Sequence, residues 1–277
     1  MTILIPATTA NLGPGFDALG LALCLYNTIS WEEGDLGETL YDDAFRYYYE
    51  VHKKPAPRVR LHFDGEIPVS RGLGSSAACI VGGLMAAWAL DGCPGKKEDL
   101  LPLANAMEGH PDNVAPCLLG GLISAKEVEG EVVVARLPMD EGWKIHLAVP
   151  DFRLSTEKAR GVLPERVPLT DAVKNIGAMP LLLHALATGD ERLLRLGIED
   201  ALVTPHRLGL IDEAKALRDA LSDYAFAISG AGPTLLFLGR EDIDEHRWED
   251  VKKNLHHDWN LLRLTVDQEG ARIKKEA

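Results

Sequence analysis

The 277-residue sequence has few cysteines, and their spacing excludes two kinds of small stabilised domain. Cys24, Cys79, Cys93 and Cys117 are far apart, and no two of them form a CxxC pair. Because zinc sites and disulfide frameworks need closely patterned cysteines, neither is indicated. We expect buried free thiols, as in a protein of the reducing cytoplasm.

Long apolar runs and a targeting segment are also lacking. The longest stretch without polar residues is 77–90, which is shorter than the roughly 20 residues of a membrane-spanning helix. Residues 1–7 contain no basic region and too short an apolar run for a signal peptide. The sequence therefore predicts a cytoplasmic protein with no membrane partner.

Excess positive charge is absent as well. The chain has 29 Lys and Arg against 42 Asp and Glu, a formal net charge of −13. No basic stripe is evident, so a nucleic-acid partner is not expected. Hydrophobic residues make up 46% and charged residues 26%, as in ordinary globular proteins. An anionic substrate would need a locally positive site on this acidic chain.

The apolar pattern predicts a mixture of strands and helices. Residues 59–64 alternate apolar and polar side chains, which is typical of a half-buried strand in an antiparallel sheet. Further strands are expected near 2–5, 122–125, 132–137, 143–149, 224–229 and 234–238, and helices near 76–90, 97–107 and over most of 169–221. Residues 19–29 fit either state. The mixture indicates an α+β fold with largely antiparallel sheets. We expect two domains, 1–150 and 151–277, with a boundary near Pro150.

A glycine loop, residues 68–78, reads PVSRGLGSSAA and opens an apolar helix. Gly72 and Gly74 allow backbone N–H groups to approach an anion, because no Cβ intervenes. The helix start adds unpaired N–H groups and the positive end of its dipole. Ser75 and Ser76 supply hydroxyls, which ligate Mg²⁺ in other phosphate loops.

The residues of this loop also resemble three other kinds of structure. A Walker A motif is excluded because no GK[ST] follows. Residues 72–77 match the dinucleotide fingerprint GxGxxA, but the preceding strand alternates and Asp91 ends a helix instead of a second strand. A simple helix N-cap by Ser75 or Ser76 remains open. Taken alone, the loop favours an anion site and a structural cap about equally.

Four further segments, in order along nearly the whole chain, join this loop in a family resemblance. Residues 6–20 read PATTANLGPGFDALG, 108–116 read EGHPDNVAP, 154–160 read LSTEKAR before Leu163 and Pro164, and 229–233 read SGAGP. The glycine loop and the last segment resemble the GHMP kinases, which include galactokinase, homoserine kinase and mevalonate kinase. The other three segments resemble the homoserine kinase branch of that superfamily.

The resemblance implies a fold and a reaction. Residues 1–150 should form an ATP-binding domain like domain 2 of ribosomal protein S5, with a left-handed crossover, and 151–277 a ferredoxin-like domain. The reaction would transfer the γ-phosphoryl group of ATP to L-homoserine, giving O-phospho-L-homoserine for threonine biosynthesis. Members of the family use Mg²⁺ and are commonly homodimers.

The same resemblance implies roles on the nucleotide side. The ATP phosphates would lie on residues 71–76, namely Arg71, Gly72, Leu73, Gly74, Ser75 and Ser76. Such loops act by positioning the phosphates and neutralising their charge. Ser76 and Glu108 are the expected Mg²⁺ ligands, since Mg²⁺ prefers hard oxygen donors. A solvated carboxylate at a helix end is the alternative for Glu108.

Other residues would bind the acceptor. Asp17 would pair with the substrate ammonium and Asn11 would help to orient it. Arg160 and Arg207 would hold the carboxylate, because a planar guanidinium suits bidentate binding. His110 is a further substrate contact. Gly232 would belong to a turn near the substrate or the glycine loop, with a plain hairpin turn as its alternative.

The fate of the hydroxyl proton stays open in the sequence. His110, Asp112 and Asn113 are expected in a loop that is punctuated by Gly109 and Pro111. The resemblance places Asn113 where other GHMP kinases have a catalytic aspartate, so that the proton would leave to a phosphate oxygen or to solvent. Asp112 acting as a general base is the alternative.

The chain also departs from the family pattern. Arg71 follows Ser70 where relatives often have Gly-Ser, His206 stands where tyrosine is usual, and Glu38 stands where asparagine is common in the adenine-binding segment. Two other functions therefore remain open. One is a GHMP kinase with another hydroxyl acceptor, such as mevalonate or shikimate. The other is a nucleotide-binding regulator without catalysis.

Overall fold

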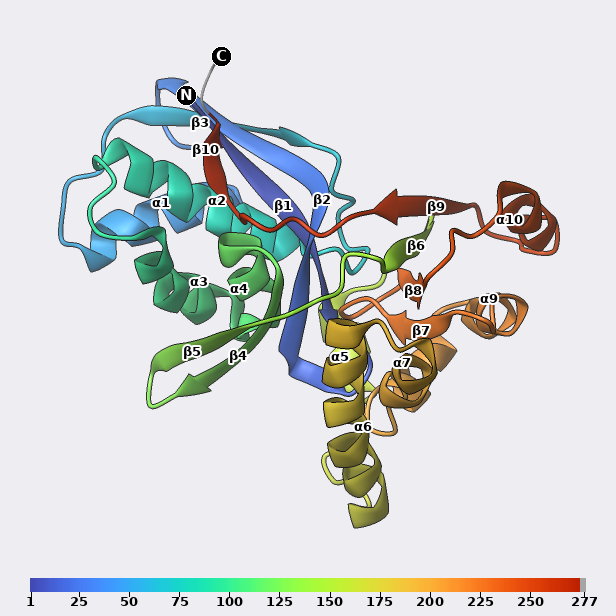
Figure 1. Ribbon diagram of the computed structural model, residues 1–277. Helices are drawn as coiled ribbons and strands as arrows, with labels where there is room; N and C mark the ends of the chain where they lie inside the picture. Colours follow the sequence, from blue (N-terminus) through green and yellow to red (C-terminus); the bar gives the residue numbers. More distant parts are fainter. Residues whose placement is uncertain (275–277) are drawn as a thin grey trace.

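The computed structural model describes residues 1–274 and contains two antiparallel sheets (Figure 1). The larger sheet has the strand order β10-β1-β2-β4-β5, with β3 paired to β2. Its strands are β1 (Thr2–Asn11), β2 (Gly15–Glu33), β3 (Val59–Gly65), β4 (Leu122–Val128), β5 (Glu131–Leu137) and β10 (Arg272–Lys274). The smaller sheet has the order β7-β8-β6-β9. Its strands are β6 (Lys144–Pro150), β7 (Ala225–Ile228), β8 (Leu235–Gly239) and β9 (Trp259–Leu264).

One group of helices packs on the larger sheet (Figure 1). It consists of α1 (Leu40–Val51), α2 (Ser75–Leu90), the 3-10 turn η1 (Lys97–Leu100), α3 (Leu101–Glu108) and α4 (Pro111–Leu119). Helix α2 is apolar on nearly every side and is buried over most of its length, between α1, β1 and α4. A helix of this composition needs such enclosure, so its N-terminus is rigidly placed.

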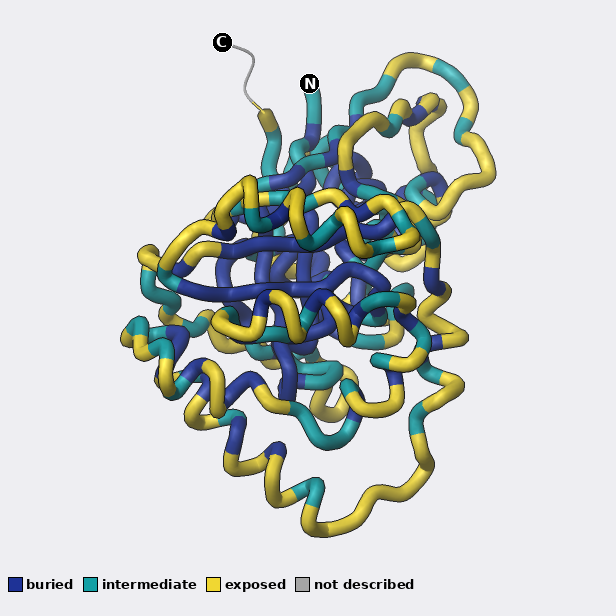
Figure 2. The backbone as a smooth tube through the Cα atoms, turned by 90° about the vertical axis from the view of Figure 1, so that its right-hand side faces the viewer, coloured by how far each residue is buried: buried dark blue, intermediate teal, exposed yellow. Residues whose placement is uncertain are grey.

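The remaining helices belong to the second half of the chain. They are α5 (Thr156–Gly161), α6 (Leu169–Thr188), α7 (Glu191–Gly197), α8 (Thr204–Arg207), η2 (Leu208–Leu210), α9 (Ala214–Ala220) and α10 (Glu245–Lys252). Two hydrophobic cores form. One extends from the larger sheet and helices α1 to α4 onto the smaller sheet and helices α6 and α7, and the other surrounds Trp259, Phe237 and Leu217. Figure 2 shows the buried strands as a dark-blue centre, with exposed segments around it.

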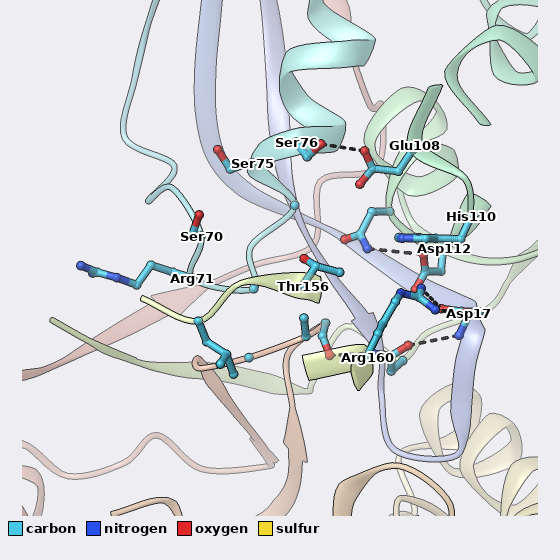
Figure 3. Close-up of a pocket in the computed structure, with 18 of the residues that line it drawn as sticks. Asp17, Ser70, Arg71, Ser75, Ser76, Glu108, His110, Asp112, Thr156 and Arg160 are labelled. Carbon is cyan, nitrogen blue, oxygen red and sulfur yellow. Dashed lines mark hydrogen bonds and ion pairs between the residues drawn. The ribbon is translucent and has the colours of Figure 1, made fainter. Parts of the chain in front are cut away.

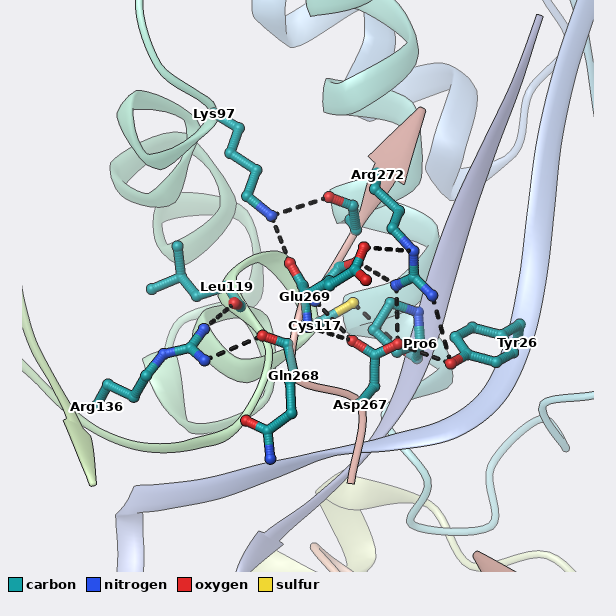
Figure 4. Close-up of polar contacts among 12 residues, drawn as sticks. Pro6, Tyr26, Lys97, Cys117, Leu119, Arg136, Asp267, Gln268, Glu269 and Arg272 are labelled. Atoms are coloured by element: carbon teal, nitrogen blue, oxygen red, sulfur yellow. Dashed lines mark hydrogen bonds and ion pairs between the residues drawn. The ribbon is translucent and has the colours of Figure 1, made fainter. Parts of the chain in front are cut away.

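The C-terminal segment 265–274 returns from the smaller sheet to the larger one (Figure 1), and Figure 4 shows its polar contacts there. Backbone hydrogen bonds join Cys24 N–H to Thr265 O at 2.9 Å and Asp267 N–H to Ala22 O at 3.0 Å. The Asp267 carboxylate accepts from the Tyr26 hydroxyl at 2.7 Å and from Arg272 at 2.8 Å. The segment therefore links both sheets, because β9 lies in one and β10 pairs with β1 of the other.

Most elements expected from the sequence are confirmed, and the sheets are antiparallel as expected. Residues 19–29 belong to strand β2, and the first strand continues past Pro6 to Asn11. The loop expected around His110 to Asn113 is wrong. Helix α4 begins at Pro111 and contains Asp112 and Asn113 in its first turn. Proline is well suited to the start of a helix, so Pro111 marks a helix start and not a loop.

The division into domains 1–150 and 151–277 stays a prediction. Strand β6 ends at Pro150 and pairs within the smaller sheet, whereas β10 pairs within the larger one. Among residues 1–274, no helix is both long and apolar enough to cross a membrane. The four cysteines have free thiols.

Candidate active site

A pocket of about 320 Å³ opens where the two halves of the chain meet (Figure 3). Its walls come from the β1–β2 turn, the glycine loop, the starts of α2 and α4, helix α5 and the turn after β7. Of the site residues expected from the sequence, Leu73 does not line it and is fully buried beneath the glycine loop. The others line the pocket: Asn11, Asp17, Arg71, Gly72, Gly74, Ser75, Ser76, Glu108, His110, Asp112, Asn113, Arg160, Arg207 and Gly232.

The glycine loop turns its carbonyl groups away from the pocket. The carbonyl oxygens of residues 70–73 accept hydrogen bonds from Leu154 N–H, Thr234 N–H, the Ser229 hydroxyl and Thr8 N–H, at 3.2, 3.3, 2.6 and 3.2 Å. In a trans peptide the N–H group points opposite to its C=O. Within the described chain, the N–H groups of residues 71–76 have no acceptor. The loop therefore offers a row of free backbone donors.

Two glycines make this loop conformation accessible. Gly72 and Gly74 have φ values of +76° and +68°, in the region that favours glycine. A Cβ on Gly72 would lie 2.3 Å from Ser229 O, and one on Gly74 would lie 1.9 Å from Thr8 Oγ1. Gly74 is the N-cap of α2 and makes no side-chain capping bond. The alternative of a helix N-cap by Ser75 or Ser76 is therefore wrong, and the helix start remains open to a ligand.

Ser76 and Glu108 face each other beside the start of α2 (Figure 3). The Ser76 hydroxyl donates to Glu108 Oε2 at 2.7 Å. Burial raises the pKa of the Glu108 carboxyl, against the smaller opposing effects of Ser76 and His110. A desolvated carboxylate next to a hydroxyl is a fitting site for a hard divalent cation, which would supply the missing counter-charge.

Asp17 and Arg160 form a bidentate ion pair across the pocket (Figure 3). The distances from Arg160 Nη2 and Nη1 to the two carboxylate oxygens of Asp17 are 2.7 and 3.0 Å. Asn11 Oδ1 accepts from the Asp17 N–H at 3.2 Å, and Asn11 Nδ2 donates to Gly230 O at 2.7 Å. The two charges expected to bind opposite ends of an amino acid therefore neutralise each other.

Arg207 is almost fully buried, with 2% of its surface exposed. Its Nε donates to Ala159 O and its Nη1 to Gly230 O, each at 3.0 Å. The guanidinium carbon lies 5.1 Å from the centre of the Phe16 ring, and that of Arg160 lies 5.4 Å from it. Burial, together with the charge of Arg160, lowers the pKa of Arg207. Arg207 thus joins α5 to the turn after β7.

A chain of side-chain contacts runs along the start of α4. His110 Nδ1 lies 2.7 Å from Asp112 Oδ1, which also accepts from Asn113 Nδ2 at 3.4 Å. Asn113 Oδ1 accepts from the Thr8 hydroxyl at 2.7 Å. Asp112 is 3% exposed, and its hydrogen bond raises the pKa of His110 above the ordinary value. His110 and Asp112 therefore both border the pocket, and Asp112 is the more deeply buried of the two.

A metal at Asp17, His110 and Asp112 is disfavoured by the local charges. Potential ligand atoms of these three residues lie within 4.8 Å of one another. However, both carboxylate oxygens of Asp17 already contact the Arg160 guanidinium. That cation occupies the place where a metal would bind.

The pocket is also lined by three other residues, Arg71, Gly232 and Cys79. The Arg71 guanidinium donates to Asp151 O at 2.6 Å and points away from Ser76 and Glu108 (Figure 3). Gly232 has a φ of +87°, in the turn between β7 and β8. Burial raises the pKa of the pocket-lining Cys79 thiol to about 11, which keeps this thiol protonated near neutral pH.

Sequence reasoning missed several residues of the site. Thr8, Thr9 and Ser229 are fully buried and tie the glycine loop to β1 and to the turn after β7. Thr156 and Phe16 line the pocket. A signal for the two threonines was present, because adjacent polar residues in a strand with buried neighbours are unusual.

Comparisons with known proteins agree with this geometry. Residues 39–121 match the model of the GHMP kinases N terminal domain. The chain is 40% identical to a homoserine kinase of Microchaete diplosiphon, covering 96% of this chain and 92% of that protein. It is 36% identical to a homoserine kinase of Clostridium botulinum, covering 97% and 96%. The crystal structure of a homoserine kinase from Cytophaga hutchinsonii superposes with a TM-score of 0.86, at 26% identity, over 98% of this chain and 96% of that one.

Proposed function

The chain belongs to the homoserine kinases of the GHMP kinase superfamily, and we propose that it transfers the γ-phosphoryl group of ATP to the hydroxyl of L-homoserine, in threonine biosynthesis. The observation that carries this proposal is the joining of two unlike surfaces in one pocket. A row of free backbone N–H groups forms one side, and the Asp17 and Arg160 pair forms the other.

The phosphates of ATP would bind the glycine loop. Its free N–H groups and the uncapped start of α2 favour an anion without requiring a positively charged side chain. Ser76 and Glu108 would hold Mg²⁺, which neutralises phosphate charge when bound. Arg71 would contribute its backbone N–H to this site, since its guanidinium is engaged with Asp151 O.

The zwitterion of homoserine fits the opposite side of the pocket. Its ammonium would take the place of Arg160 on the Asp17 carboxylate, and its carboxylate would take the place of Asp17 on Arg160. One ion pair within the protein would thereby be replaced by two ion pairs with the zwitterion, so that neither Asp17 nor Arg160 is left unpaired. Asn11 would orient Asp17, and Arg207 and Gly232 would shape the floor beside the substrate.

The acceptor hydroxyl would lose its proton to a phosphate oxygen or to solvent. Asp112 is a poor candidate for a general base, because it is 3% exposed and Asp112 Oδ1 already contacts His110 and Asn113. His110 and Asn113 would instead contact the acceptor side directly. In phosphoryl transfer, positioning and charge neutralisation supply most of the catalysis.

Three broader proposals accompany this function. We propose a cytoplasmic location, which the free thiols support, and the two-domain division near Pro150. We also propose a homodimer. Its support is the apolar face of α6, where Leu169, Val173 and Ile176 are 79%, 58% and 70% exposed, at spacings that share one side of a helix. Ile176→Lys should then yield a monomer in light scattering, and an unchanged mass would place the interface elsewhere.

The decisive experiment measures ADP release with Mg·ATP and a panel of acceptors. The panel contains L-homoserine, mevalonate, shikimate, galactose and a sample without acceptor. We expect turnover that is strongly selective for L-homoserine. Turnover of another alcohol would overturn the acceptor assignment, and ATP binding without any turnover would favour a regulator.

A further inference from the structure

Thr8 lies between the glycine loop and the start of α4. Its side chain is fully buried on β1, and its hydroxyl donates to Asn113 Oδ1 at 2.7 Å. Its N–H donates to Leu73 O at 3.2 Å. The Thr8 hydroxyl is also packed so closely against Gly74 that a Cβ there would lie 1.9 Å from it. One residue thus contacts both the nucleotide side and the acceptor side.

The hydrogen bond from Thr8 determines which way the Asn113 amide faces. Asparagine has an acceptor oxygen and a donor nitrogen of nearly equal size. Because the Thr8 hydroxyl donates to Oδ1, the Nδ2 group is turned toward Asp112 Oδ1, at 3.4 Å, and toward the pocket. Asp112 in turn holds His110 at 2.7 Å. A series of hydrogen bonds thus connects Thr8 to Asn113, Asp112 and His110 on the acceptor side.

We propose that Thr8 is a positioning residue for phosphoryl transfer, which fixes the Asn113 amide relative to the glycine loop. The inference rests on the proposed function, because it assigns Asn113 to the reacting hydroxyl. Thr8 itself lies behind Gly74 and Asn113, and it is not among the residues that line the pocket. It acts through Asn113 on the geometry of transfer and leaves the binding of either substrate largely unaffected.

The test compares Thr8→Val with Thr8→Ser. Valine keeps the shape of threonine and removes the hydroxyl, whereas serine keeps the hydroxyl. Small misplacements of reacting groups cost up to about 100-fold in rate. We expect Thr8→Val to lower kcat by about 10- to 100-fold and to change both KM values by less than about 3-fold. Thr8→Ser should retain most of the activity.

Thr234→Val is the matched control for a buried threonine near the same loop. Thr234 is fully buried, and its hydroxyl has no hydrogen-bond partner among the described residues. This variant should keep kcat within about 2-fold of the wild type, since no side-chain hydrogen bond is lost. A loss of kcat in Thr234→Val equal to that in Thr8→Val would attribute both to general repacking, and would overturn the inference.

A double-mutant cycle separates positioning from mere stability. If Thr8 acts through Asn113, Thr8→Val should have little further effect in an Asn113→Ala background. Multiplicative losses of kcat in the double variant would contradict the inference, as would full activity of Thr8→Val. An NMR measurement of the Asn113 side-chain amide serves independently of turnover. Its shift should change in Thr8→Val and stay unchanged in Thr234→Val.

These readouts also separate the two proposals. Absence of homoserine turnover in the wild-type protein would defeat the proposed function, while the amide shift would still report whether Thr8 orients Asn113. Normal wild-type turnover with an unaffected Thr8→Val variant would defeat the positioning role alone.

Discussion

The two sides of the pocket differ in the chemical groups that they present to a ligand. The nucleotide side, formed by the glycine loop with Ser76 and Glu108, consists mainly of backbone groups from one continuous segment. The acceptor side consists of charged side chains, Asp17, His110, Arg160 and Arg207, which come from four separate parts of the chain.

This difference predicts different sensitivities. A backbone site tolerates changes of side chain but not an added Cβ at its glycines, because the added atom displaces the donors themselves. A site of paired charges tolerates small backbone shifts but not the loss of one partner, which leaves the other charge unpaired. Each of the following experiments tests one part of this comparison.

The largest effect is expected for Gly74→Ala. The new Cβ would lie 1.9 Å from Thr8 Oγ1, in a residue with φ of +68°. The start of α2 must therefore move, and we expect affinity for Mg·ATP, measured by calorimetry, to fall by at least about 100-fold.

Gly130→Ala is the matched control for that experiment. Gly130 has a comparable φ of +85°, but no atom lies within 4 Å of its added Cβ. It should lower stability by about 1 kcal/mol through backbone strain alone and leave ATP affinity unchanged. Normal ATP affinity in Gly74→Ala would mean that the loop does not hold the phosphates.

A large effect confined to the acceptor is expected for Arg160→Ala. Removing the guanidinium removes the charge-assisted hydrogen bonds proposed for the substrate carboxylate, each worth about 1.5–3 kcal/mol before solvent screening of this partly exposed pair reduces them. The value of kcat/KM for homoserine should fall by about 30- to 1000-fold, while the dissociation constant of ATP changes little. Arg58→Ala, which breaks the exposed pair with Asp35, should alter neither quantity. An equal loss of ATP affinity in Arg160→Ala would contradict the division into two sides.

Asp112→Asn is expected to have a moderate effect on the titration of His110 and on the pH dependence of stability. The hydrogen bond to Asp112 is the main cause of the raised pKa of His110. The variant should therefore move the NMR titration of His110 to lower pH. The pKa of His110 is higher in the folded protein than in the unfolded chain, where it is about 6.5. Protonated His110 therefore stabilises the folded protein fully at pH values below about 6.5. This contribution to the free energy of unfolding is lost as the pH rises through the pKa that His110 has in the folded protein.

The consequence for unfolding has a definite sign. Asp112→Asn should reduce the free energy of unfolding more at pH 5.5 than at pH 8.5, because only the protonated imidazole gains from the carboxylate. An unshifted titration of His110 would show that Asp112 does not control it.

The smallest effect is expected for Arg71→Ala, on the nucleotide side. Its guanidinium donates to Asp151 O and points away from Ser76 and Glu108. If backbone N–H groups carry the phosphates, the KM for ATP should rise by less than about 3-fold. A rise of about 10-fold or more would mean that the guanidinium swings into the pocket when ATP is bound.

The sequence determined much of this protein by itself. The glycine loop is continuous in sequence, and its donors follow from glycine positions and a helix start, so residues 71–76 could be predicted as a unit. The alternation in residues 59–64 likewise identified β3. Such features depend on local backbone preferences, which a sequence displays directly.

Only the tertiary structure decided how the distant residues combine. The pairing of Asp17 with Arg160 depends on the packing of α5 against the β1–β2 turn, and the burial of Asp112 depends on α4. The contact of Thr8 with both Gly74 and Asn113 joins three segments that lie far apart in sequence. The residue types in a sequence indicate which chemistry is available. The distances that select among partners arise from long-range packing, for which a single sequence contains no local signal.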